Sequence, residues 1–207
     1  MSGSAIVLGA GPGLGAALSR RFSEAGLAVS IGARDGERVA ALAAEIVAAG
    51  GHAVGVAVDA GDEASVTDFA ARAERDLGPI EVAIHNPGVS APSTPLEDGV
   101  FARGIKNSVL DLKAADLEAS WRVICLGGFF LGREAARRMV ARGHGTIIFS
   151  GATASVRGSA LFARTAIPKA GLRALAQSMA RELGPRGIHV AHVVIDGQIL
   201  APRYKEL

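Results

Sequence analysis

The sequence predicts an α/β protein built on a parallel sheet of six strands. Short apolar runs alternate with longer amphipathic runs along the 207 residues, and this alternation is typical of parallel sheets with right-handed helical crossovers. The short runs are apolar throughout, as strands are when both faces of their sheet are covered. Glycines stand where many of these runs end. We therefore expect a doubly wound sheet in strand order 3-2-1-4-5-6, with no seventh strand and with ligands at its carboxyl edge.

The chain is interpreted as one domain over residues 1–207, because its length suits one sizeable core and no linker or internal repeat interrupts it. Strands are expected over Ala5–Leu8, Ala28–Gly32, His52–Val58, Ile80–His85, Thr146–Ser150 and Ile188–Ile195. Helices are expected over Leu14–Ala25, Gly36–Ala49, Glu63–Leu77, Ala114–Ala141 and Pro168–Leu183. The segment Pro87–Leu112 breaks this rhythm, since it is rich in Pro, Gly and Ser, and it borders the expected ligand edge.

Composition excludes several classes of protein. Charged residues make up 20% of the chain, the net charge is +2 and acidic and basic residues alternate, so we expect no nucleic-acid partner. The single cysteine, Cys125, excludes an intramolecular disulfide and a cysteine-based metal site, and no metal is expected. No apolar run approaches the ~20 residues of a membrane span and no signal peptide is apparent, which predicts a cytoplasmic protein without a membrane partner. Arginines at helical spacing are interpreted as a solvated helix face: Arg133, Arg137, Arg138 and Arg142.

A glycine-rich turn follows the first expected strand and opens the first helix. It reads Gly-Ala-Gly-Pro-Gly-Leu-Gly over residues 9–15. A pyrophosphate needs close backbone approach without a Cβ and free N–H groups at a helix N-terminus, so the strand–turn–helix context indicates a dinucleotide site of Rossmann type. The spacing alone allows two registers, one that uses Gly9 and Gly15 and one that uses Gly11 and Ala16. The candidate binding residues are Gly9, Gly11, Pro12, Gly13, Leu14 and Gly15.

The end of the second expected strand bears on the choice of dinucleotide. Sites that prefer NAD usually place an acidic residue here to accept a hydrogen bond from the ribose 2′-hydroxyl, whereas an arginine suits the 2′-phosphate of NADP. This chain has Arg34, followed by Asp35. The sequence therefore favours NADP(H), and Asp35 leaves NAD(H) open.

Further motifs carry a resemblance to the short-chain dehydrogenase/reductase family over nearly the full length of the chain. Val58-Asp59 resembles the family's adenine-binding pair, and His85-Asn86-Pro87-Gly88 resembles its Asn-Asn-Ala-Gly segment. Lys169 and the following Ala-Gly-Leu-Arg-Ala-Leu are similar to its active-site helix. Segments 121–130 and 187–190 resemble its long dimerising helix and the entry to its sixth strand. The resemblance implies the Gly9-Gly13-Gly15 register and cofactor contacts from Asp59, Asn86, Gly88 and Lys169.

The resemblance also implies catalytic residues, and the chain departs from most of them. The family's tyrosine stands four residues before the lysine, where this chain has Thr165. The family's serine aligns with Ala152 and its asparagine with Ile124, while the only tyrosine is Tyr204. An aliphatic hydroxyl has a pKa far above the ~10 of a phenol, and a nearby ammonium shifts it by only a few units. Thr165 is therefore a doubtful catalytic partner for Lys169. Other hydroxyls lie close by, on Ser150, Thr153 and Ser155.

Two functions fit these residues. The first is an NADP(H)-binding oxidoreductase that transfers hydride to a small carbonyl or from an alcohol, with Lys169 and a non-standard proton donor. The candidate donors are Thr165, Thr153 and His85; His85 is the best placed of the five histidines because it ends the fourth strand. The second is a catalytically silent nucleotide-binding sensor or partner subunit. A third hypothesis has no cofactor site at all.

The family resemblance further implies a homodimer or homotetramer. Members of the family associate through the long helix, and this chain has small residues there that would allow close contact between helices. These residues are Gly127, Gly128 and Gly132.

Overall fold

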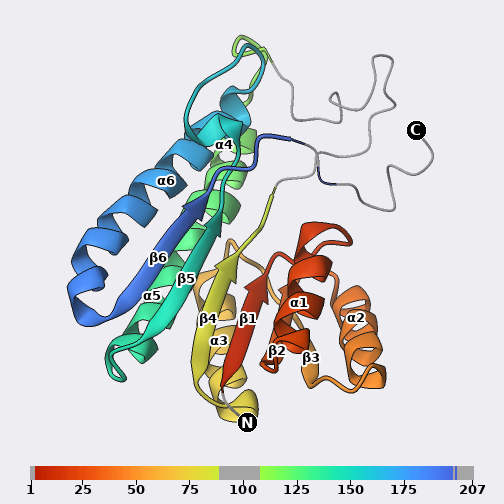
Figure 1. Ribbon diagram of the computed structural model, residues 1–207. Coiled ribbons are helices and arrows are strands. Elements are labelled where there is room, and N and C mark those ends of the chain that lie inside the picture. The colour runs from red at the N-terminus through yellow and green to blue at the C-terminus, as the bar shows by residue number, and fades with distance from the viewer. Residues whose placement is uncertain (1–2, 89–107, 198, 200–207) are drawn as a thin grey trace.

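A computed structural model describes residues 3–88, 108–197 and 199 of the chain. Its strands form one parallel sheet in the order β3-β2-β1-β4-β5-β6, which confirms the predicted Rossmann-type architecture (Figure 1). The change of direction in this order lies between β1 and β4, the place where such sheets bind ligands. The strands are β1 Ser4–Leu8, β2 Ala28–Ala33, β3 Ala53–Ala57, β4 Ile80–His85, β5 Gly145–Ser150 and β6 Ile188–Val193.

The helices agree with the prediction in all but two places. Asp35 and Asp62 cap α2 and α3, each accepting a hydrogen bond from a backbone N–H in the first turn. The helices are α1 Leu14–Glu24, α2 Gly36–Ala48, α3 Glu63–Leu77, α4 Ala114–Trp121, α5 Gly127–Val140 and α6 Ala163–Leu183. Short 3-10 turns cover Thr153–Ser155 and Gly184–Arg186.

The expected long helix over residues 114–141 is interrupted. A π-helical turn, Arg122–Leu126, joins α4 to α5. The hydrophobic pattern does not separate a π turn from an α turn, because both are helical and the turn adds a single residue to one repeat. The glycines after it are buried against their own chain: a Cβ on Gly128 would meet Leu172, and one on Gly132 would lie 3.0 Å from Phe149 and Met179. The prediction that these glycines serve contact between subunits is therefore wrong.

Helix α6 begins at Ala163, five residues before the predicted start at Pro168. Proline is common in the first turn of a helix, but here Pro168 lies inside the helix. The earlier start has a consequence for the site. It places Thr165 and Lys169 on the same helix at positions i and i+4, which share one face.

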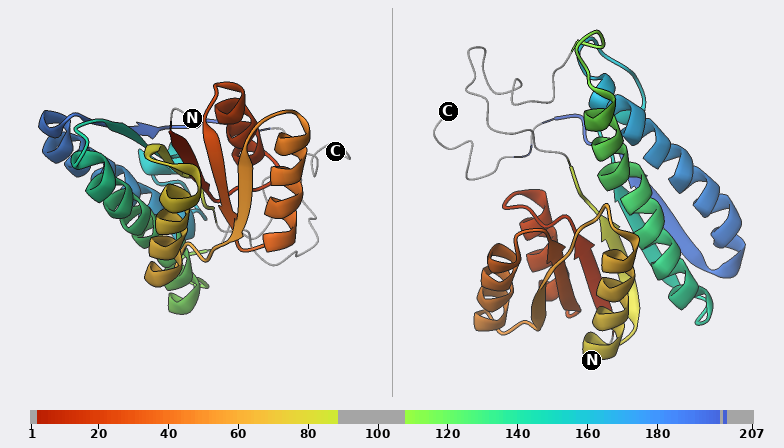
Figure 2. Two further views of the ribbon diagram at one scale, coloured as in Figure 1. Left: turned by 90° about the horizontal axis from the view of Figure 1, so that it is seen from below. Right: turned by 180° about the vertical axis from the view of Figure 1, so that it is seen from behind.

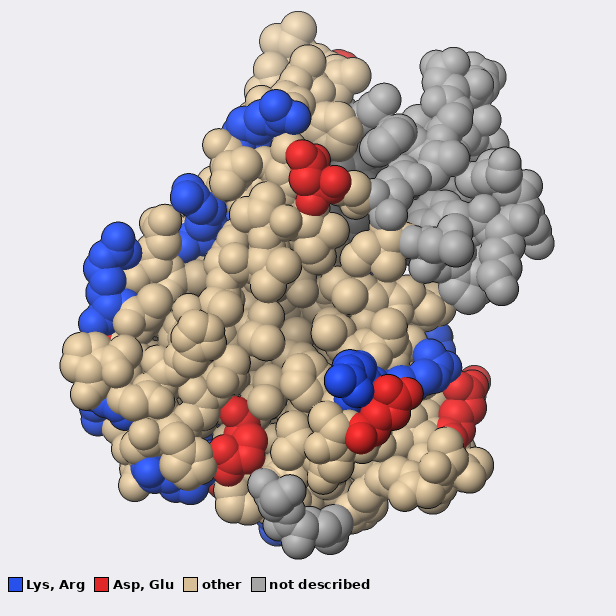
Figure 3. All heavy atoms as spheres, viewed as in Figure 1, with Lys and Arg blue, Asp and Glu red and all other residues tan. Residues whose placement is uncertain are grey.

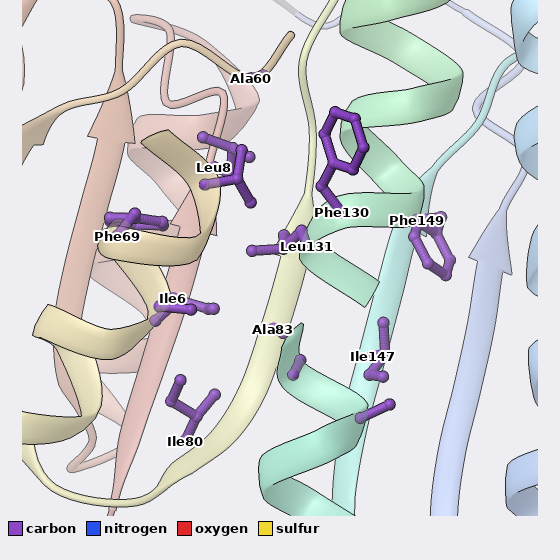
Figure 4. Close-up of a cluster of buried hydrophobic side chains, with 14 of the residues drawn as sticks. Ile6, Leu8, Ala60, Phe69, Ile80, Ala83, Phe130, Leu131, Ile147 and Phe149 are labelled. Atoms are coloured by element: carbon purple, nitrogen blue, oxygen red, sulfur yellow. The ribbon is translucent and has the colours of Figure 1, made fainter. Parts of the chain in front are cut away.

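Two apolar layers sandwich the sheet. Ile6 and Leu8 of β1 face α3 and α5, where they join Phe69 and Leu131 in the larger core cluster (Figure 4). Val7, between them, faces the opposite side with residues of α1 and α2. Figure 2 shows α1 and α2 on one face of the sheet and α3, α5 and α6 on the other. The alternation within β1 explains its uniformly apolar sequence.

Coverage of the second face stops short of the β6 edge. Within the described ranges, no helix lies over β5 and β6 on the side that carries α1 and α2 (Figure 1). Val193 of β6 is accordingly 47% exposed. The expectation that the strands are covered on both faces therefore holds for β1 and β2 and is wrong for β6 in the described part of the chain.

The surface carries scattered charge. On the face drawn in Figure 3, separate Lys and Arg side chains lie along the left margin and others lie beside Asp and Glu towards the lower right, and they form no continuous basic area over the described residues. None of the described helices is long and apolar enough to span a membrane.

A buried carboxylate joins the arginines of α5. Glu134 accepts hydrogen bonds from Arg138 Nη1 at 2.8 Å and Arg137 Nη1 at 2.9 Å, and Arg133 Nε lies 3.5 Å from it. Burial raises the pKa of Glu134, but the hydrogen bond and charge of Arg138 and the charges of the other two arginines outweigh it, so this pKa lies below its usual range. Arg138 and Arg142 also reach Glu74 of α3. The interpretation of these arginines as a solvated face is wrong for most of them.

Replacing this carboxylate should destabilise the protein. Glu134→Ala leaves three arginines without their shared partner, and we expect a loss of about 2–3 kcal/mol in the free energy of unfolding at pH 7, measured by urea denaturation. The pKa of Glu134 is lower in the folded protein than in the unfolded chain, where it is about 4.3. The difference in unfolding free energy between wild type and Glu134→Ala should therefore be largest above about pH 4.3 and be lost as the pH falls through the folded pKa. Glu118→Ala, an exposed glutamate on α4, is the control and should change little. Equal stability of the two variants would contradict this assignment.

Candidate functional site

The glycine turn is locked to the end of β4. Gly9 has φ +89°, and a Cβ there would lie 2.7 Å from the backbone of Asn86 and Pro87. Asn86 Nδ2 donates to the Gly9 carbonyl at 2.9 Å, and its N–H donates to the Leu8 carbonyl at 2.8 Å. Only glycine fits the first position of the turn.

The rest of the turn presents backbone to an open space. Gly15 packs tightly, since a Cβ there would lie 2.5 Å from Ala10 Cα, whereas a Cβ on Gly11 would meet nothing within 4 Å. Gly13 caps α1 without a side-chain hydrogen bond, and the first turn of α1, which begins at Leu14, holds no acidic residue. Pro12 is exposed in the same turn. The Ala16 N–H donates to the Gly11 carbonyl at 3.0 Å, whereas the N–H groups of Leu14 and Gly15 have no backbone acceptor among the described residues and are left for an external one.

Asp35 and Arg34 follow β2, and they differ in their partners. The Asp35 carboxylate accepts from the Arg38 N–H at 3.0 Å and lies 3.3 Å from the Arg38 guanidinium. Its oxygens are therefore engaged in capping α2. Arg34 is exposed, and among the described residues it forms no ion pair within 4.0 Å.

The remaining predicted cofactor contacts lie at the same edge of the sheet. Asp59 follows β3, and its Oδ1 accepts from the Gly61 N–H at 2.8 Å. Its own N–H donates to Ser65 Oγ at 3.1 Å. Gly88 lies three residues after β4 and is exposed, with open space where a Cβ would stand.

Lys169 belongs to α6, and its side chain is buried beside the carboxyl end of β5. It is 8% exposed, and its Nζ donates to the Ser150 carbonyl at 2.7 Å. No carboxylate within the described ranges forms an ion pair with it. Burial lowers the pKa of Lys169 to about 8. A buried lysine with such a pKa exchanges protons near neutral pH.

Thr165 lies one turn before Lys169. Its Oγ1 is buried and has no hydrogen-bond partner among the described residues. A buried hydroxyl without a partner is unusual and calls for an explanation.

Two of the other hydroxyls near the site, those of Ser155 and Thr153, are engaged within the protein. Ser155 Oγ accepts from the Ala152 N–H at 3.0 Å. Thr153 Oγ1 donates to Asp196 Oδ1, a contact that ties the turn after β5 to the segment after β6. Both hydroxyls hold the loops together, and Ile124, at the family's asparagine position, is fully buried.

His85 is a structural residue rather than the proposed acid. It is 1% exposed, and its Nε2 hydrogen-bonds the Ile124 carbonyl of the π turn at 3.0 Å. Burial and the charge of Lys169 lower the pKa of His85 to about 3. The imidazole is therefore neutral at physiological pH, which argues against His85 among the candidate proton donors.

His192 is a neighbour of Lys169 that no sequence motif connects with the site. It extends from β6 against Gly151, where the added Cβ of any other residue would strike its ring. Burial and the charges of Lys169 and Arg173 lower its pKa, and its Nε2 is buried without a partner among the described residues. No local motif marks it, because its proximity to Lys169 comes from the pairing of β5 with β6.

The described residues contain no group of three or more His, Cys, Asp or Glu side chains able to hold a metal ion. Tyr204 and residues 89–107 of the Pro87–Leu112 segment lie outside the described residues.

The strand order and the glycine turn after β1 define a protein of the Rossmann class. The family model for the short chain dehydrogenases matches residues 4–201. The chain belongs to this family of oxidoreductases.

Similar proteins support this assignment. A curated L-rhamnose 1-dehydrogenase (NAD(P)(+)) of Azotobacter vinelandii is 34% identical over 206 residues, which cover 97% of this chain and 75% of the relative. The crystal structure of a short-chain dehydrogenase from Rhodopseudomonas palustris is 42% identical, with a TM-score of 0.83 over 95% of this chain and 86% of that one. A metagenomic short-chain oxidoreductase solved in complex with NADP is 29% identical, with a TM-score of 0.83 over 95% and 82%.

Two glycines of the turn should respond differently to substitution. Gly9→Ala forces a side chain into the left-handed region and against β4, and we expect a loss of about 3 kcal/mol in unfolding free energy, measured by urea denaturation. Gly11→Ala is the matched control and should fold with wild-type stability, because its Cβ has free space. An unaltered Gly9→Ala protein would refute the packing described for this turn.

The buried neutral His85 should make stability depend on pH. Its folded pKa of about 3 lies below the unfolded value of about 6.5, so the unfolded chain binds the proton and stability falls as pH drops from 6.5 towards 3. His85→Gln can still donate to the Ile124 carbonyl but does not titrate. Urea denaturation at pH 7 and 4.5 should therefore show a smaller loss of stability on acidification in the variant. The same loss in both proteins would exclude His85 as the cause.

Proposed function

We propose that this protein binds NADP(H) and transfers hydride between this cofactor and a small carbonyl or alcohol. The observation that carries the proposal is the buried Lys169 ammonium, held without a carboxylate partner in the described residues at the sheet edge that carries the glycine turn. An isolated buried charge is costly, and it is retained where a site uses it.

The fit of the residues to a dinucleotide supports the proposal. The uncapped N-terminus of α1 offers N–H groups to a pyrophosphate, and the space at Gly11 allows the backbone to be approached. In this assignment the turn from Gly9 to Gly15 binds the pyrophosphate, Asp59 binds near the adenine, and Asn86, Gly88 and Lys169 bind towards the nicotinamide. The cofactor would supply the hydride.

The preference for NADP over NAD rests on Arg34. Its guanidinium is exposed after β2, where the 2′-phosphate of NADP would be bound. Asp35, the residue that left NAD open, has its carboxylate engaged with α2 and Arg38. The metagenomic relative was solved with NADP, and the L-rhamnose dehydrogenase is named for both cofactors.

A catalytically silent sensor or partner subunit is the second candidate. This alternative is favoured by the residues at the family's catalytic positions. Thr165 stands in place of the tyrosine and cannot replace its phenol, and Ile124, an apolar core residue, stands in place of the asparagine. In this alternative the protein binds NADP(H) without turnover. The two functions differ in whether any carbonyl in a substrate panel oxidises NADPH in the presence of the protein.

Three further features belong to the same proposal. We infer one NAD(P)-binding domain over residues 1–207, a cytoplasmic location, and a homodimer or homotetramer. The family relationship supports the oligomer. A monomeric mass in light scattering would exclude it.

Direct titration of cofactor fluorescence tests the binding assignment. NADPH should bind the wild type, and Arg34→Ala should weaken NADPH by about tenfold, as expected for the loss of one charge-assisted contact, while NADH affinity changes little. Arg181→Ala, an exposed arginine in the last turn of α6, is the control and should change neither. No binding at millimolar NADPH would sink the proposed function, and equal losses for both cofactors would remove Arg34 as the selecting residue.

A further inference from the structure

We propose that Lys169 itself donates the proton to the substrate oxygen, beside the hydroxyl of Thr165, which binds that oxygen. This inference rests on the proposed function and extends it to the acid–base group. In the family pattern described above, a tyrosine stands four residues before the lysine. Here the tyrosine position is occupied by a side chain that cannot act as the acid, so the proton needs another source.

The Lys169 ammonium has N–H donors beyond the one that its neighbour accepts. The Ser150 carbonyl accepts one N–H of Nζ, and an ammonium has three donors. No carboxylate in the described residues forms an ion pair with Nζ. An acid partner would hold the proton on the amine, and its absence leaves burial to favour release.

The titratable groups around Lys169 do not compete with it. His85 on β4 is buried and neutral, and His192 on β6 has its pKa lowered by burial and by the cations Lys169 and Arg173. Burial also raises the pKa of Cys125 in the π turn. Burial therefore favours the neutral form of both imidazoles, and it makes the Cys125 thiol a weaker acid that retains its proton.

The hydroxyls divide into engaged and open groups. Ser155 and Thr153 are bonded within the loops, to Ala152 and Asp196. Thr165 Oγ1 is buried and unpartnered among the described residues, on the helix face it shares with Lys169. A carbonyl oxygen placed between the two would accept one hydrogen bond from each and satisfy both.

Every bond, proton and electron pair in the proposed step is accounted for. During reduction, the carbonyl carbon accepts hydride from NADPH while an N–H bond of Lys169 breaks and an O–H bond forms at the substrate oxygen. The products are an alcohol, oxidised cofactor and a neutral amine, which regains its proton from water. Oxidation of an alcohol runs the same bonds in reverse.

Amine reactivity without cofactor provides the first test. Acetic anhydride modifies only the neutral amine, and peptide-resolved mass spectrometry separates Lys169 from the exposed Lys113, the internal reference. We expect the modification of Lys169 to rise through a midpoint near pH 8. A midpoint at the same pH as that of Lys113 would overturn the proposal.

Turnover with NADPH provides the second test. Lys169→Arg keeps a permanent positive charge and hydrogen-bond donors but cannot release a proton. At saturating NADPH, we expect it to lose at least ~100-fold in kcat, the scale of general acid catalysis. Lys113→Arg is the matched control and should be active. Lys169→Arg turnover within about tenfold of wild type would contradict the proposal, since charge alone would then suffice.

The pH profile separates the role of the Thr165 hydroxyl from that of the Lys169 amine. In wild type, kcat for reduction should be flat below about pH 8 and decline above it, and kcat for oxidation should rise through the same value. Thr165→Val should lower kcat/KM by about tenfold, the cost of one hydrogen bond, with the midpoint unchanged. A pH-independent wild type, or a midpoint lost in Thr165→Val, would overturn the assignment of Lys169.

These outcomes are distinct from failure of the proposed function. A wild type that does not bind NADPH removes the oxidoreductase proposal itself. A wild type that binds NADPH but reduces no carbonyl supports the silent alternative and contradicts this inference. Circular dichroism melts of each variant show whether a loss of turnover comes from unfolding.

Discussion

The contact between the glycine turn and the end of β4 is the constraint on which the site depends. Gly9 lies so close to Asn86 and Pro87 that no side chain fits between them, and Asn86 hydrogen-bonds the Gly9 carbonyl. This contact joins the two central strands where the sheet reverses its order. It holds the open N-terminus of α1 at the same edge of the sheet as Lys169.

The buried charge of Lys169 determines the electrostatics of this edge of the sheet. Lys169 is buried with a carbonyl as its partner, and burial together with its charge lowers the pKa of two imidazoles beside it, His85 and His192. In contrast, the cations of α5 surround the buried Glu134, which stabilises the fold. Among the described residues, the buried carboxylate of Glu134 is thus paired with arginines, while the buried Lys169 has a carbonyl and no carboxylate as its partner.

Much of the fold could be predicted because local patterns determine it. Each strand was located from its apolar run, and α2 and α3 from their amphipathic pattern, with aspartate caps at their starts. Two departures have local causes that the pattern does not record. A π turn has nearly the same periodicity as an α turn, and Pro168 suggested a helix start although the helix continues through it. The coverage of β6 was not predictable either, because it depends on which elements lie over the strand.

The sequence by itself determined the element order, the glycine turn and the presence of Lys169, because these depend on spacing along the chain. Only the tertiary structure decided what surrounds them. It buries His85 against the π turn, brings His192 beside Lys169, and engages Asp35 with α2, so that Arg34 stands without an ion pair in the described residues. Burial and strand pairing set these properties, and both arise from residues far apart in the sequence.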